Sequence, residues 1–394
     1  MHVAFYAPLK APDHPVPSGD RRVAALLMEA IGMAGHRVSL ADHLRSRDPS
    51  GDPVRQARLA RIGRARAERL LRRYRAGPPE ARPDLWFTYH LYYKAPDWIG
   101  PRVAEALNIP YVVAEASVAD KRADGPWDTG HRATLRALEQ AALVVTLNPR
   151  DAECLPDQDK VRLLPPFLDL APLQAAAQSR RSERQALATR LALDPSVPWI
   201  AVVAMMREGD KLASYRLLAE ALRPLDRLNW RLLVIGDGPT RGQVEAAFAG
   251  FALASGVPRV HFLGALEPKA LAATLAACDL LAWPAVREAF GMALLEAQAI
   301  GLPVVAGRSG GVPAIVRDGE TGLLTPEGDA ERFAEALRRL LENHEPRHRL
   351  GANAAQAMVQ RHGLAQAAQR LDEILHEARA AQAKTDRTKP AAAL

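Results

Sequence analysis

The chain contains Glu288-Ala-Phe-Gly-Met-Ala-Leu-Leu-Glu296, in which two carboxylates stand eight residues apart where a strand gives way to a helix. Upstream, the short apolar run Leu280–Trp283 ends at Pro284 and is typical of a buried parallel strand. Downstream, apolar residues recur at helical spacing over residues 290–300. We therefore expect Glu288 in the loop that precedes a helix.

The residues at the start of this predicted helix suit an anion. Phe290 and Gly291 fall near its first turn, where free backbone N–H groups and the helix dipole favour a phosphate. Gly291 would let that phosphate come close, because it has no side chain. Glu296 lies further along the helix and can accept hydrogen bonds from sugar or ribose hydroxyls. Two glutamates at this spacing can also be ordinary solvated helix charges.

Apolar runs alternate with helical patterns along both halves of the chain. Residues 21–33 and 134–142 show the helical spacing. The predicted strands are residues 2–6, 37–40, 85–89, 111–114, 143–147 and 161–164 in the first half, and 199–204, 232–235, 260–263, 280–283, 304–306 and 323–324 in the second. This order predicts an α/β protein made of two Rossmann-like domains with parallel sheets.

The length of 394 residues supports two domains, because single hydrophobic cores stop growing at roughly 250–300 residues. Pro165-Pro166-Phe167-Leu168-Asp169 interrupts the strand and helix alternation. A polar, alanine-rich segment follows it, and we place the connection there. The predicted boundaries are residues 1–172 for the first domain, 173–360 for the second, 361–379 for a closing helix and 380–394 for a disordered tail.

Residues 288–341 resemble the retaining GT-B glycosyltransferases of family 4. The glutamate pair is followed by Gly301-Leu-Pro-Val-Val-Ala306, Gly310-Gly-Val-Pro313 and Asp318-Gly-Glu-Thr-Gly-Leu-Leu324, in the order in which that family carries them. The resemblance implies a GT-B fold, with two Rossmann-like domains whose parallel sheets face across a cleft, and hexosyltransferase activity. It assigns Glu288 to the hydroxyls of the donor sugar and Glu296 to the ribose of the nucleotide.

A basic pair follows the first predicted strand of the second domain. Arg207 and Lys211 lie at the carboxyl edge of a parallel sheet, where α/β proteins bind ligands. A guanidinium and an ammonium are the expected stabilisers of a departing diphosphate when no metal takes part. The resemblance assigns both residues to the diphosphate, although Met206 stands where the family commonly has glycine. Two surface cations in a loop are the alternative interpretation.

Three glycines complete the predicted donor site. Gly236 and Gly238 form a turn after the strand at residues 232–235, and the resemblance places that turn beside the nucleotide. A lone Gly-x-Gly is weak evidence, because such turns often merely end a strand. Gly19 lies between the first strand and the first helix, where family members carry a glycine loop that approaches the donor phosphates.

The first domain departs from the family pattern. Where the family often has a histidine after a strand, this chain has Glu115-Ala-Ser117. His90 and His131 are possible substitutes, and Glu115 is a possible acceptor-positioning residue. A lone histidine is more often structural. The family mechanism is usually described as front-face, so a protein base is not obligatory.

The sequence predicts neither a cofactor nor a metal. Cys154 and Cys278 have no metal or redox spacing and suit a reducing cytosol. Asp157-Gln-Asp159 has the Asp-x-Asp spacing of metal-dependent transferases, but it does not follow a strand and is interpreted as a solvated loop. No stretch approaches the roughly 20 apolar residues of a transmembrane helix, and the chain opens on a strand instead of a signal peptide.

The charge of the chain is concentrated in one segment. Residues 55–75 hold nine arginines and one acid, Glu68, so this segment carries +8 while the whole chain carries +7. Leu59, Ile62, Leu70, Leu71 and Tyr74 fall near one side of the predicted helix, which is the composition of an interfacial helix attracted to anionic lipid. A solvated outer helix with partly paired arginines is the second interpretation. Nucleic acid is the third and least favoured partner.

These observations predict a metal-independent glycosyltransferase that uses a nucleotide-sugar donor and a glycan or lipid acceptor of envelope polysaccharide or glycolipid synthesis. We expect it in the cytoplasm, peripherally at the inner face of the membrane. A sugar-nucleotide epimerase of related fold and a noncatalytic nucleotide-sugar binding protein remain as alternatives. A dinucleotide oxidoreductase is disfavoured, because Gly-x-Gly-x-x-Gly does not follow the first strand.

Overall fold

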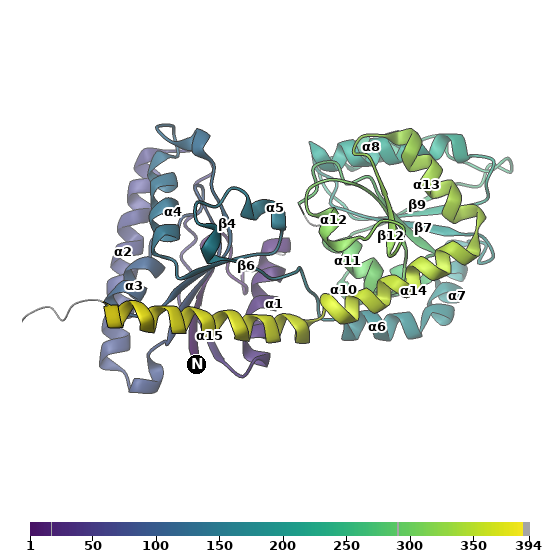
Figure 1. The fold of residues 1–394 in the computed structure, drawn as a ribbon. Helices are drawn as coiled ribbons and strands as arrows, with labels where there is room; N and C mark the ends of the chain where they lie inside the picture. Colours follow the sequence, from purple (N-terminus) through teal and green to yellow (C-terminus); the bar gives the residue numbers. More distant parts are fainter. Residues whose placement is uncertain (17, 290, 389–394) are drawn as a thin grey trace, which may run out of the picture. The chain divides into compact units, whose positions relative to one another are not determined.

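A computed structural model describes residues 1–16, 18–289 and 291–388, and it divides the chain into two compact units (Figure 1). The first unit comprises Met1–Pro165 together with the C-terminal segment from Leu364, and the second comprises Pro166–Gly363. The chain thus passes from the first unit to the second at the Pro165-Pro166 pair and returns after Gly363. The sequence placed these two passages at 172/173 and 360/361.

The first unit is built on a six-stranded sheet in the order β2-β1-β3-β4-β5-β6, and all of its neighbouring strands are parallel. Every strand that the sequence predicts is present, with ends that differ by at most three residues. The strands are β1 (His2–Tyr6), β2 (Arg37–Leu40), β3 (Leu85–Tyr92), β4 (Tyr111–Ser117), β5 (Leu143–Thr146) and β6 (Val161–Leu163).

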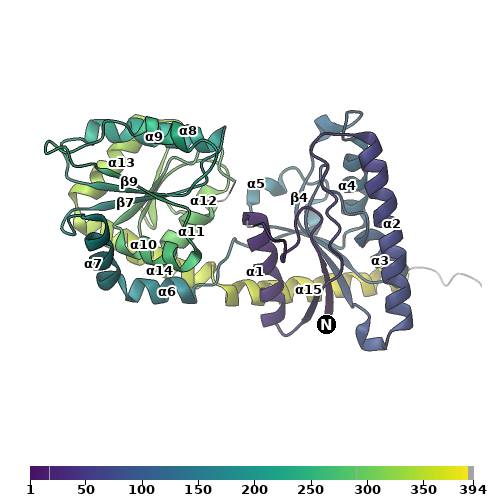
Figure 2. The ribbon, with the colours of Figure 1, turned by 180° about the vertical axis from the view of Figure 1, so that it is seen from behind.

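Helices cover both faces of the first sheet. The views in Figures 1 and 2 place α2, α3 and α4 on one face and α1 on the other. Large apolar side chains fill the space between the sheet and α2, among them Tyr6, Trp86 and Tyr111. The helices of this unit are α1 (Gly19–Met33), α2 (Pro53–Ala76), α3 (Gly100–Leu107), α4 (Asp128–Gln140), α5 (Pro149–Ala152) and α15 (Leu364–Thr388).

The arginine-rich segment forms α2, and its apolar side faces inward. Leu70, Leu71 and Tyr74 are buried in the core, and Leu59 and Ile62 pack against it. The prediction of an interfacial helix is therefore wrong in one respect. The apolar face of α2 packs into the core of the unit and is not free to enter a lipid interface. Most of the arginines lie on the exposed side.

The C-terminal helix is longer than predicted. We expected the helical segment to end at residue 379 and disorder to begin at residue 380, whereas α15 continues to Thr388. Its apolar side packs on α1 and β4, and Leu371, Ile374 and Leu375 are fully buried. Residues 389–394 of the predicted tail lie outside the described residues.

The second unit contains another six-stranded parallel sheet, in the order β12-β11-β10-β7-β8-β9. Here too the strand positions follow the sequence prediction, since each predicted run forms a strand. The strands are β7 (Trp199–Val203), β8 (Arg231–Ile235), β9 (Val260–Gly264), β10 (Leu280–Trp283), β11 (Val304–Gly307) and β12 (Gly322–Thr325).

Two groups of helices cover the second sheet. In Figure 1, α8 and α13 lie on one face, and α6, α7, α10, α11 and α14 lie on the other. The helices are α6 (Ala171–Gln178), α7 (Arg180–Leu191), α8 (Asp210–Leu222), α9 (Arg241–Ala247), α10 (Pro268–Ala277), α11 (Met292–Ala299), α12 (Val312–Ile315), α13 (Ala330–Glu342) and α14 (His344–Arg361).

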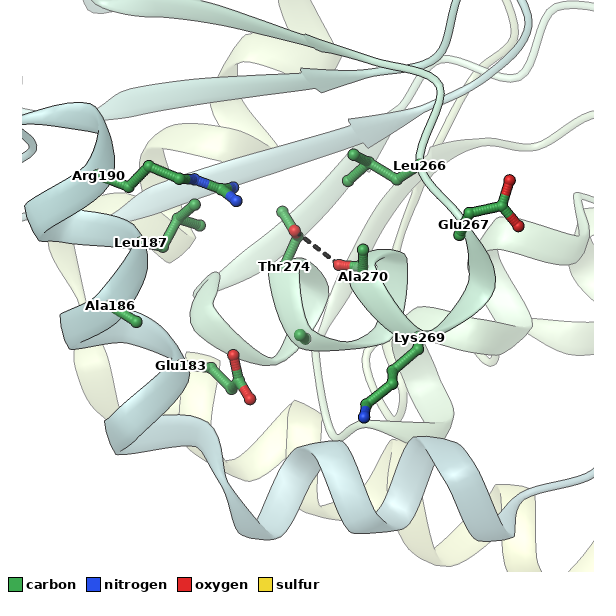
Figure 3. Close-up of a pocket in the computed structure, with 10 residues that line it drawn as sticks. Glu183, Ala186, Leu187, Arg190, Leu266, Glu267, Lys269, Ala270 and Thr274 are labelled. Atoms are coloured by element: carbon green, nitrogen blue, oxygen red, sulfur yellow. Dashed lines mark hydrogen bonds between the residues drawn. The ribbon is translucent and has the colours of Figure 1, made fainter.

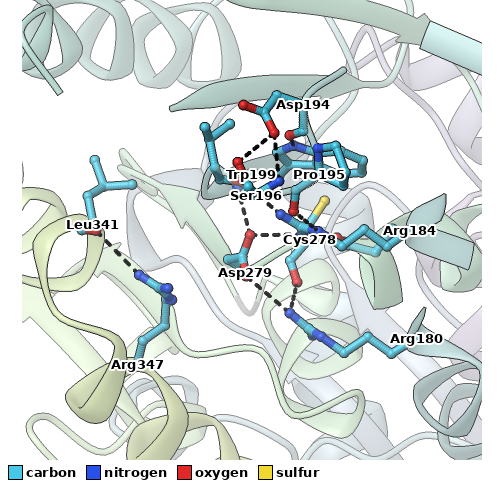
Figure 4. Close-up of polar contacts among 12 residues, drawn as sticks. Arg180, Arg184, Asp194, Pro195, Ser196, Trp199, Cys278, Asp279, Leu341 and Arg347 are labelled. Carbon is cyan, nitrogen blue, oxygen red and sulfur yellow. Dashed lines mark hydrogen bonds and ion pairs between the residues drawn. The ribbon is translucent and has the colours of Figure 1, made fainter. Parts of the chain in front are cut away.

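The half-buried carboxylate of Asp279 organises the amino edge of the second sheet (Figure 4). Asp279 Oδ2 accepts hydrogen bonds from the backbone of Trp199 at 2.8 Å and from Arg184 Nη1 at 2.9 Å. Arg180 approaches the other carboxylate oxygen at 3.3 Å, and the Arg184 guanidinium stacks 4.2 Å from the Trp199 ring. These contacts join α7 to the starts of β7 and β10. This cluster therefore stabilises the sheet at the edge opposite its carboxyl ends.

Candidate functional site

The central feature of the second unit is an ion pair between Lys211 and Glu288. The Lys211 ammonium donates to Glu288 Oε2, and the Trp283 indole N–H donates to the same oxygen at 2.9 Å. The ammonium also lies 5.2 Å from the Trp283 ring centroid, within reach of a cation–π interaction. The two charged side chains are only 20% and 12% exposed. The pair is thus held in a partly desolvated position, where charge interactions are stronger than in water.

Strand ends bring these residues together. Trp283 is the last residue of β10, Glu288 follows in the next loop, and Lys211 lies in the first turn of α8, which follows β7. Since β7 and β10 are parallel neighbours, both loops leave the sheet at its carboxyl edge. The sequence predicted this location for each residue but assigned them separate roles. Their direct contact, and the part played by Trp283, are findings of the structure.

Glycines fix the loop that carries Glu288. A side chain on Gly310 would place its Cβ 1.9 Å from the Glu288 carbonyl oxygen, and one on Gly307 would lie 2.0 Å from that of Pro284. Gly310 also has φ +48°, and Gly311 N–H donates to the Ala289 carbonyl at 2.8 Å. The loop after β11 is therefore packed backbone to backbone against the loop after β10. This packing explains why the double glycine belongs to the site.

The turn at Gly236 and Gly238 makes a second close contact at the same edge. Their φ values are +136° and +153°, and added Cβ atoms would lie 1.9 Å from the Ala204 carbonyl oxygen and 2.2 Å from that of Met206. The Met206 N–H donates to the Asp237 carbonyl at 2.9 Å. Met206, which departs from the family pattern, is fully buried and holds the turn through its backbone.

The other predicted donor residues of the second unit occupy different positions. The Arg207 side chain is exposed in the loop between β7 and α8. Gly291 is the N-cap of α11 with φ +74°, as expected for a residue at the start of that helix. Glu296 lies within α11 and is 5% exposed. Phe290 lies outside the described residues, so its predicted role stays a prediction.

The first unit has its own polar cluster at the carboxyl edge of its sheet. His90 in β3 and Glu115 in β4 sit at adjacent register positions, since Tyr89 pairs with Ala114 and Leu91 with Ala116. Both have left-handed backbones, with φ +67° and +58°. Non-glycine residues rarely adopt this conformation, and it costs roughly 1–3 kcal/mol each. The sequence named both residues but gave no sign that they are neighbours.

Electrostatics distinguish the members of this cluster. Burial raises the pKa of Glu115 from 4.5 to about 7, although its carboxylate accepts a 2.6 Å hydrogen bond from the Leu147 N–H. His90 Nδ1 lies 3.1 Å from Asp20 Oδ1, and this interaction lowers the pKa of Asp20. Asp20 was not predicted. Its position in the first turn of α1, one residue after Gly19, was the available signal.

Two predicted residues of the first unit stand apart from this cluster. His131 is buried within α4 instead of following a strand, and no contact found among the described residues joins it to His90 or Glu115. Gly19 begins α1, where the Ser18 hydroxyl caps the helix by accepting from the Arg21 N–H. An added Cβ at Gly19 would meet nothing within 4 Å. The local packing of the unit therefore does not require glycine there.

A groove beside α7 is lined by residues other than those described above (Figure 3). It has a volume of about 490 Å³ and is formed by α7, α10 and the residues that lead into α10. Its charged lining residues are Glu183, Arg190, Glu267 and Lys269, and none of them is a predicted donor residue. This groove therefore does not include the donor-site residues that the sequence predicts.

The predicted solvated loop is confirmed. Asp157 caps a short turn at Gln158–Lys160 by accepting from the Asp159 N–H, and both aspartates are exposed. Cys154 is exposed and Cys278 is buried, and both are free. Within the described part of the chain, no helix has the length and apolar character needed to span a membrane.

Solved structures of known proteins define the class of this fold. The complex of Anabaena Alr3699/HepE with UDP matches 95% of this chain and 100% of that chain, with a TM-score of 0.71 and 16% identity. A glycosyltransferase from Rickettsia africae matches 96% of this chain and 98% of its own, with a TM-score of 0.74 and 15% identity. With its two Rossmann-like parallel sheets, the protein has the GT-B fold that the sequence predicted.

The family follows from the second unit. Residues 201–357 match the family described as Glycosyl transferases group 1, and this stretch includes Lys211, the Gly236 turn, Glu288 and Glu296. The chain therefore carries a domain of the glycosyl transferases group 1 family, as the resemblance predicted.

Curated relatives agree with this family. A D-inositol 3-phosphate glycosyltransferase from Corynebacterium efficiens is 33% identical over 203 residues, which are 51% of this chain and 47% of that protein. The matched stretch thus spans just under half the length of that relative.

Proposed function

We propose that the protein transfers a hexose from a nucleoside diphosphate sugar to an acceptor hydroxyl, with retention of configuration at the anomeric carbon. The observation that carries this proposal is the Lys211–Glu288 pair at the carboxyl edge of the second sheet, inside the matched family domain. Two glycine-dependent loop contacts hold the same edge, and one of them is made with the Glu288 backbone.

The pair supplies complementary chemistry for the donor. As the diphosphate leaves, negative charge grows on its oxygens, and the Lys211 ammonium and the exposed Arg207 guanidinium stabilise that charge. The Glu288 carboxylate, relieved of its ion pair, accepts hydrogen bonds from sugar hydroxyls. Trp283 keeps this carboxylate oriented through its indole N–H. Gly291 and Glu296 serve the phosphate and the ribose in this scheme.

The transfer step balances without a protein nucleophile. The bond between the anomeric carbon and the diphosphate oxygen breaks, and the acceptor oxygen bonds to that carbon from the same face. The acceptor proton passes to the leaving phosphate oxygen. We propose that no metal takes part, because Lys211 and Arg207 provide the positive charge that a metal would otherwise bring.

We assign acceptor positioning to the first unit. Glu115 and the Asp20–His90 pair lie at the carboxyl edge of its sheet, where α/β domains bind ligands. A carboxyl with a pKa of about 7 can both donate and accept a hydrogen bond near neutral pH. Glu115 would therefore orient an acceptor hydroxyl in either protonation state.

The acceptor is proposed to be a glycan or lipid of the cell envelope, reached at the inner membrane surface. The support is electrostatic: Arg58, Arg61, Arg64 and Arg72 project from the exposed side of α2, whose other side is core. Such a surface attracts anionic lipid by about 1 kcal/mol per arginine without inserting apolar side chains. The acceptor screen should also include D-inositol 3-phosphate, after the name of the relative.

One experiment separates transfer from its alternatives. Purified protein is incubated in EDTA with UDP-, GDP- and ADP-hexoses, each with and without acceptor, and the anomeric protons are followed by NMR. Acceptor-dependent release of the nucleoside diphosphate and a product with the donor's anomeric configuration are expected. Turnover of the sugar nucleotide without acceptor would indicate an epimerase, and donor binding without turnover of any acceptor would indicate a binding protein.

A further inference from the structure

Three residues far apart in sequence converge in the first unit. His36 lies between α1 and β2, and Asp372 and His376 lie one helical turn apart on α15. One ligand atom from each residue lies within 4.8 Å of the others. Since α15 packs along α1, residues separated by more than 300 positions become neighbours. The sequence gave no sign of this cluster, because no motif spacing links the two segments.

We propose that His36, Asp372 and His376 bind a divalent transition metal, for which Zn²⁺ is the best match. Two imidazoles and one carboxylate are ligands that Zn²⁺ commonly takes in proteins. Tetrahedral zinc with bonds of about 2.0–2.1 Å places its ligand atoms about 3.3 Å apart. Here Asp372 Oδ1 lies 3.0 Å from His36 Nε2 and 3.4 Å from His376 Nε2. Two of the three ligand spacings thus match those of tetrahedral zinc, and the third is within 4.8 Å.

The buried histidine is the second observation that points to a ligand. His36 is 8% exposed, and its Nε2 atom, 3.0 Å from Asp372 Oδ1, makes no well-oriented hydrogen bond among the described residues. Its Nδ1 atom lies 3.4 Å from the Met1 nitrogen. A buried ring nitrogen without a well-oriented hydrogen bond is costly. A metal in contact with Nε2 would satisfy it.

The helix presents the other two ligands without rearrangement. Side chains at i and i+4 lie on the same face of a helix, so Asp372 and His376 reach the same point. The His376 and Asp372 side chains are 60% and 42% exposed, which gives the metal an entry path and a place for a water ligand. The rings of His36 and His376 meet edge to face, with centroids 5.8 Å apart.

The metal would act as a structural clip and not as a catalyst. It would tie the C-terminal helix to the turn that precedes β2, at the amino edge of the first sheet, whereas Lys211 and Glu288 belong to the second unit. A link that closes a long stretch of chain restricts the unfolded state. Binding energy to a site that exists only in the folded state adds to stability. This inference is independent of the proposed transfer reaction.

The test uses the full chain, stripped with EDTA and then freed of chelator, and titrated calorimetrically with Zn²⁺ alone. We expect one site per chain and a rise in melting temperature. The rise should saturate at one equivalent of Zn²⁺. His376→Ala and Asp372→Asn should each weaken the affinity at least about 100-fold, since even residues that only orient metal ligands contribute 10–100-fold. His43→Ala, at another exposed histidine of the first unit, is the control and should bind as the parent does.

Cobalt provides a readout of geometry. Co²⁺ at the site should give the visible absorption of a tetrahedral complex, and His36→Gln should abolish it. His344 and His348, stacked one turn apart on α14, are the competing site. Zinc affinity that survives in His376→Ala and Asp372→Asn but is lost in His344→Ala would overturn the proposal, as would absence of binding to the parent. His376 is exposed, so its loss leaves the fold intact.

Discussion

The carboxyl edges of the two sheets are built by different means. In the second unit, Gly236, Gly238 and Gly310 let neighbouring loops touch backbone to backbone, and the functional side chains project from the loops so fixed. In the first unit, His90 and Glu115 themselves adopt the left-handed conformation within their strands. Glycines shape the edge in the second unit, whereas in the first unit the backbone is strained at the candidate functional residues. Glycine patterns can be read in a sequence, whereas strain at ordinary residues cannot.

The largest effect is expected from the charged pair of the second unit. Glu288→Ala and Lys211→Ala should each lower the transfer rate by about 10²–10³-fold, the usual loss when one preorganised group that stabilises transition-state charge is removed. Each single substitution leaves the charged partner without its ion pair. The loss of transition-state stabilisation in the double variant should therefore be smaller than the sum of the two single losses. Steady-state rates measured with all three variants test this. Additive losses would show that the two residues act separately.

The second prediction concerns Glu115, at the strained carboxyl edge of the first sheet. Because the pKa of Glu115 is raised to about 7, the folded protein keeps this proton after the unfolded chain has released it. Ionisation of Glu115 therefore lowers the free energy of unfolding as the pH rises from about 4.5 to 7. Glu115→Gln should raise the free energy of unfolding at pH 8 by up to about 3 kcal/mol and change it little at pH 4. Urea unfolding at both pH values measures this, and an equal change at both would refute the raised pKa.

The glycine-shaped edge is tested by Gly310→Ala. The new Cβ would collide with the Glu288 carbonyl, so we expect weaker donor binding and a loss of stability of about 1–3 kcal/mol. Gly328→Ala is the matched control, because Gly328 has φ +82° but open space around it. Both variants carry the strain of the left-handed backbone, and only Gly310→Ala carries the collision. Equal donor affinity in the two would show that the loop contact does not shape the site.

The smallest effect concerns the arginines of α2. The double variant Arg61→Ser/Arg64→Ser should weaken binding to vesicles of phosphatidylserine and phosphatidylcholine by about 30-fold, since each arginine near the surface contributes about 1 kcal/mol. Arg181→Ser/Arg190→Ser, in exposed positions of the second unit, is the charge-matched control. Flotation with both variants at low and physiological salt provides the measurement. Equal losses of vesicle binding in the two double variants would show that net charge, and not the position of the arginines on α2, determines the binding.

Much of the fold was predictable because its signals are local. Strands such as β1 and β10 are short apolar runs bounded by turn residues, and the loop that holds Glu288 follows directly from where β10 ends. The donor-site residues share the edge to which parallel strands deliver their loops. The sequence could not show that Lys211 and Glu288 pair with each other, because that contact depends on side-chain geometry between two loops 77 residues apart.

The failures share a physical cause, which is that burial depends on the tertiary environment. The apolar pattern of α2 fits a membrane-facing helix as well as a core helix. Its packing in the core of the first unit shows that it is a core helix. Alanine-rich polar sequence after residue 379 suggested disorder, but the helix continues to Thr388. Asp20 became visible only when β3 brought His90 within 3.1 Å.

The most direct test is calorimetric titration of the full chain with UDP, GDP and ADP in the presence of EDTA. The account predicts that one of these nucleoside diphosphates binds selectively without metal, and that Lys211→Ala weakens its binding at least about tenfold while the melting temperature of the free protein changes little. Absence of binding by all three, or equal affinity in the parent and in Lys211→Ala, would contradict the assignment of this sheet edge to the donor.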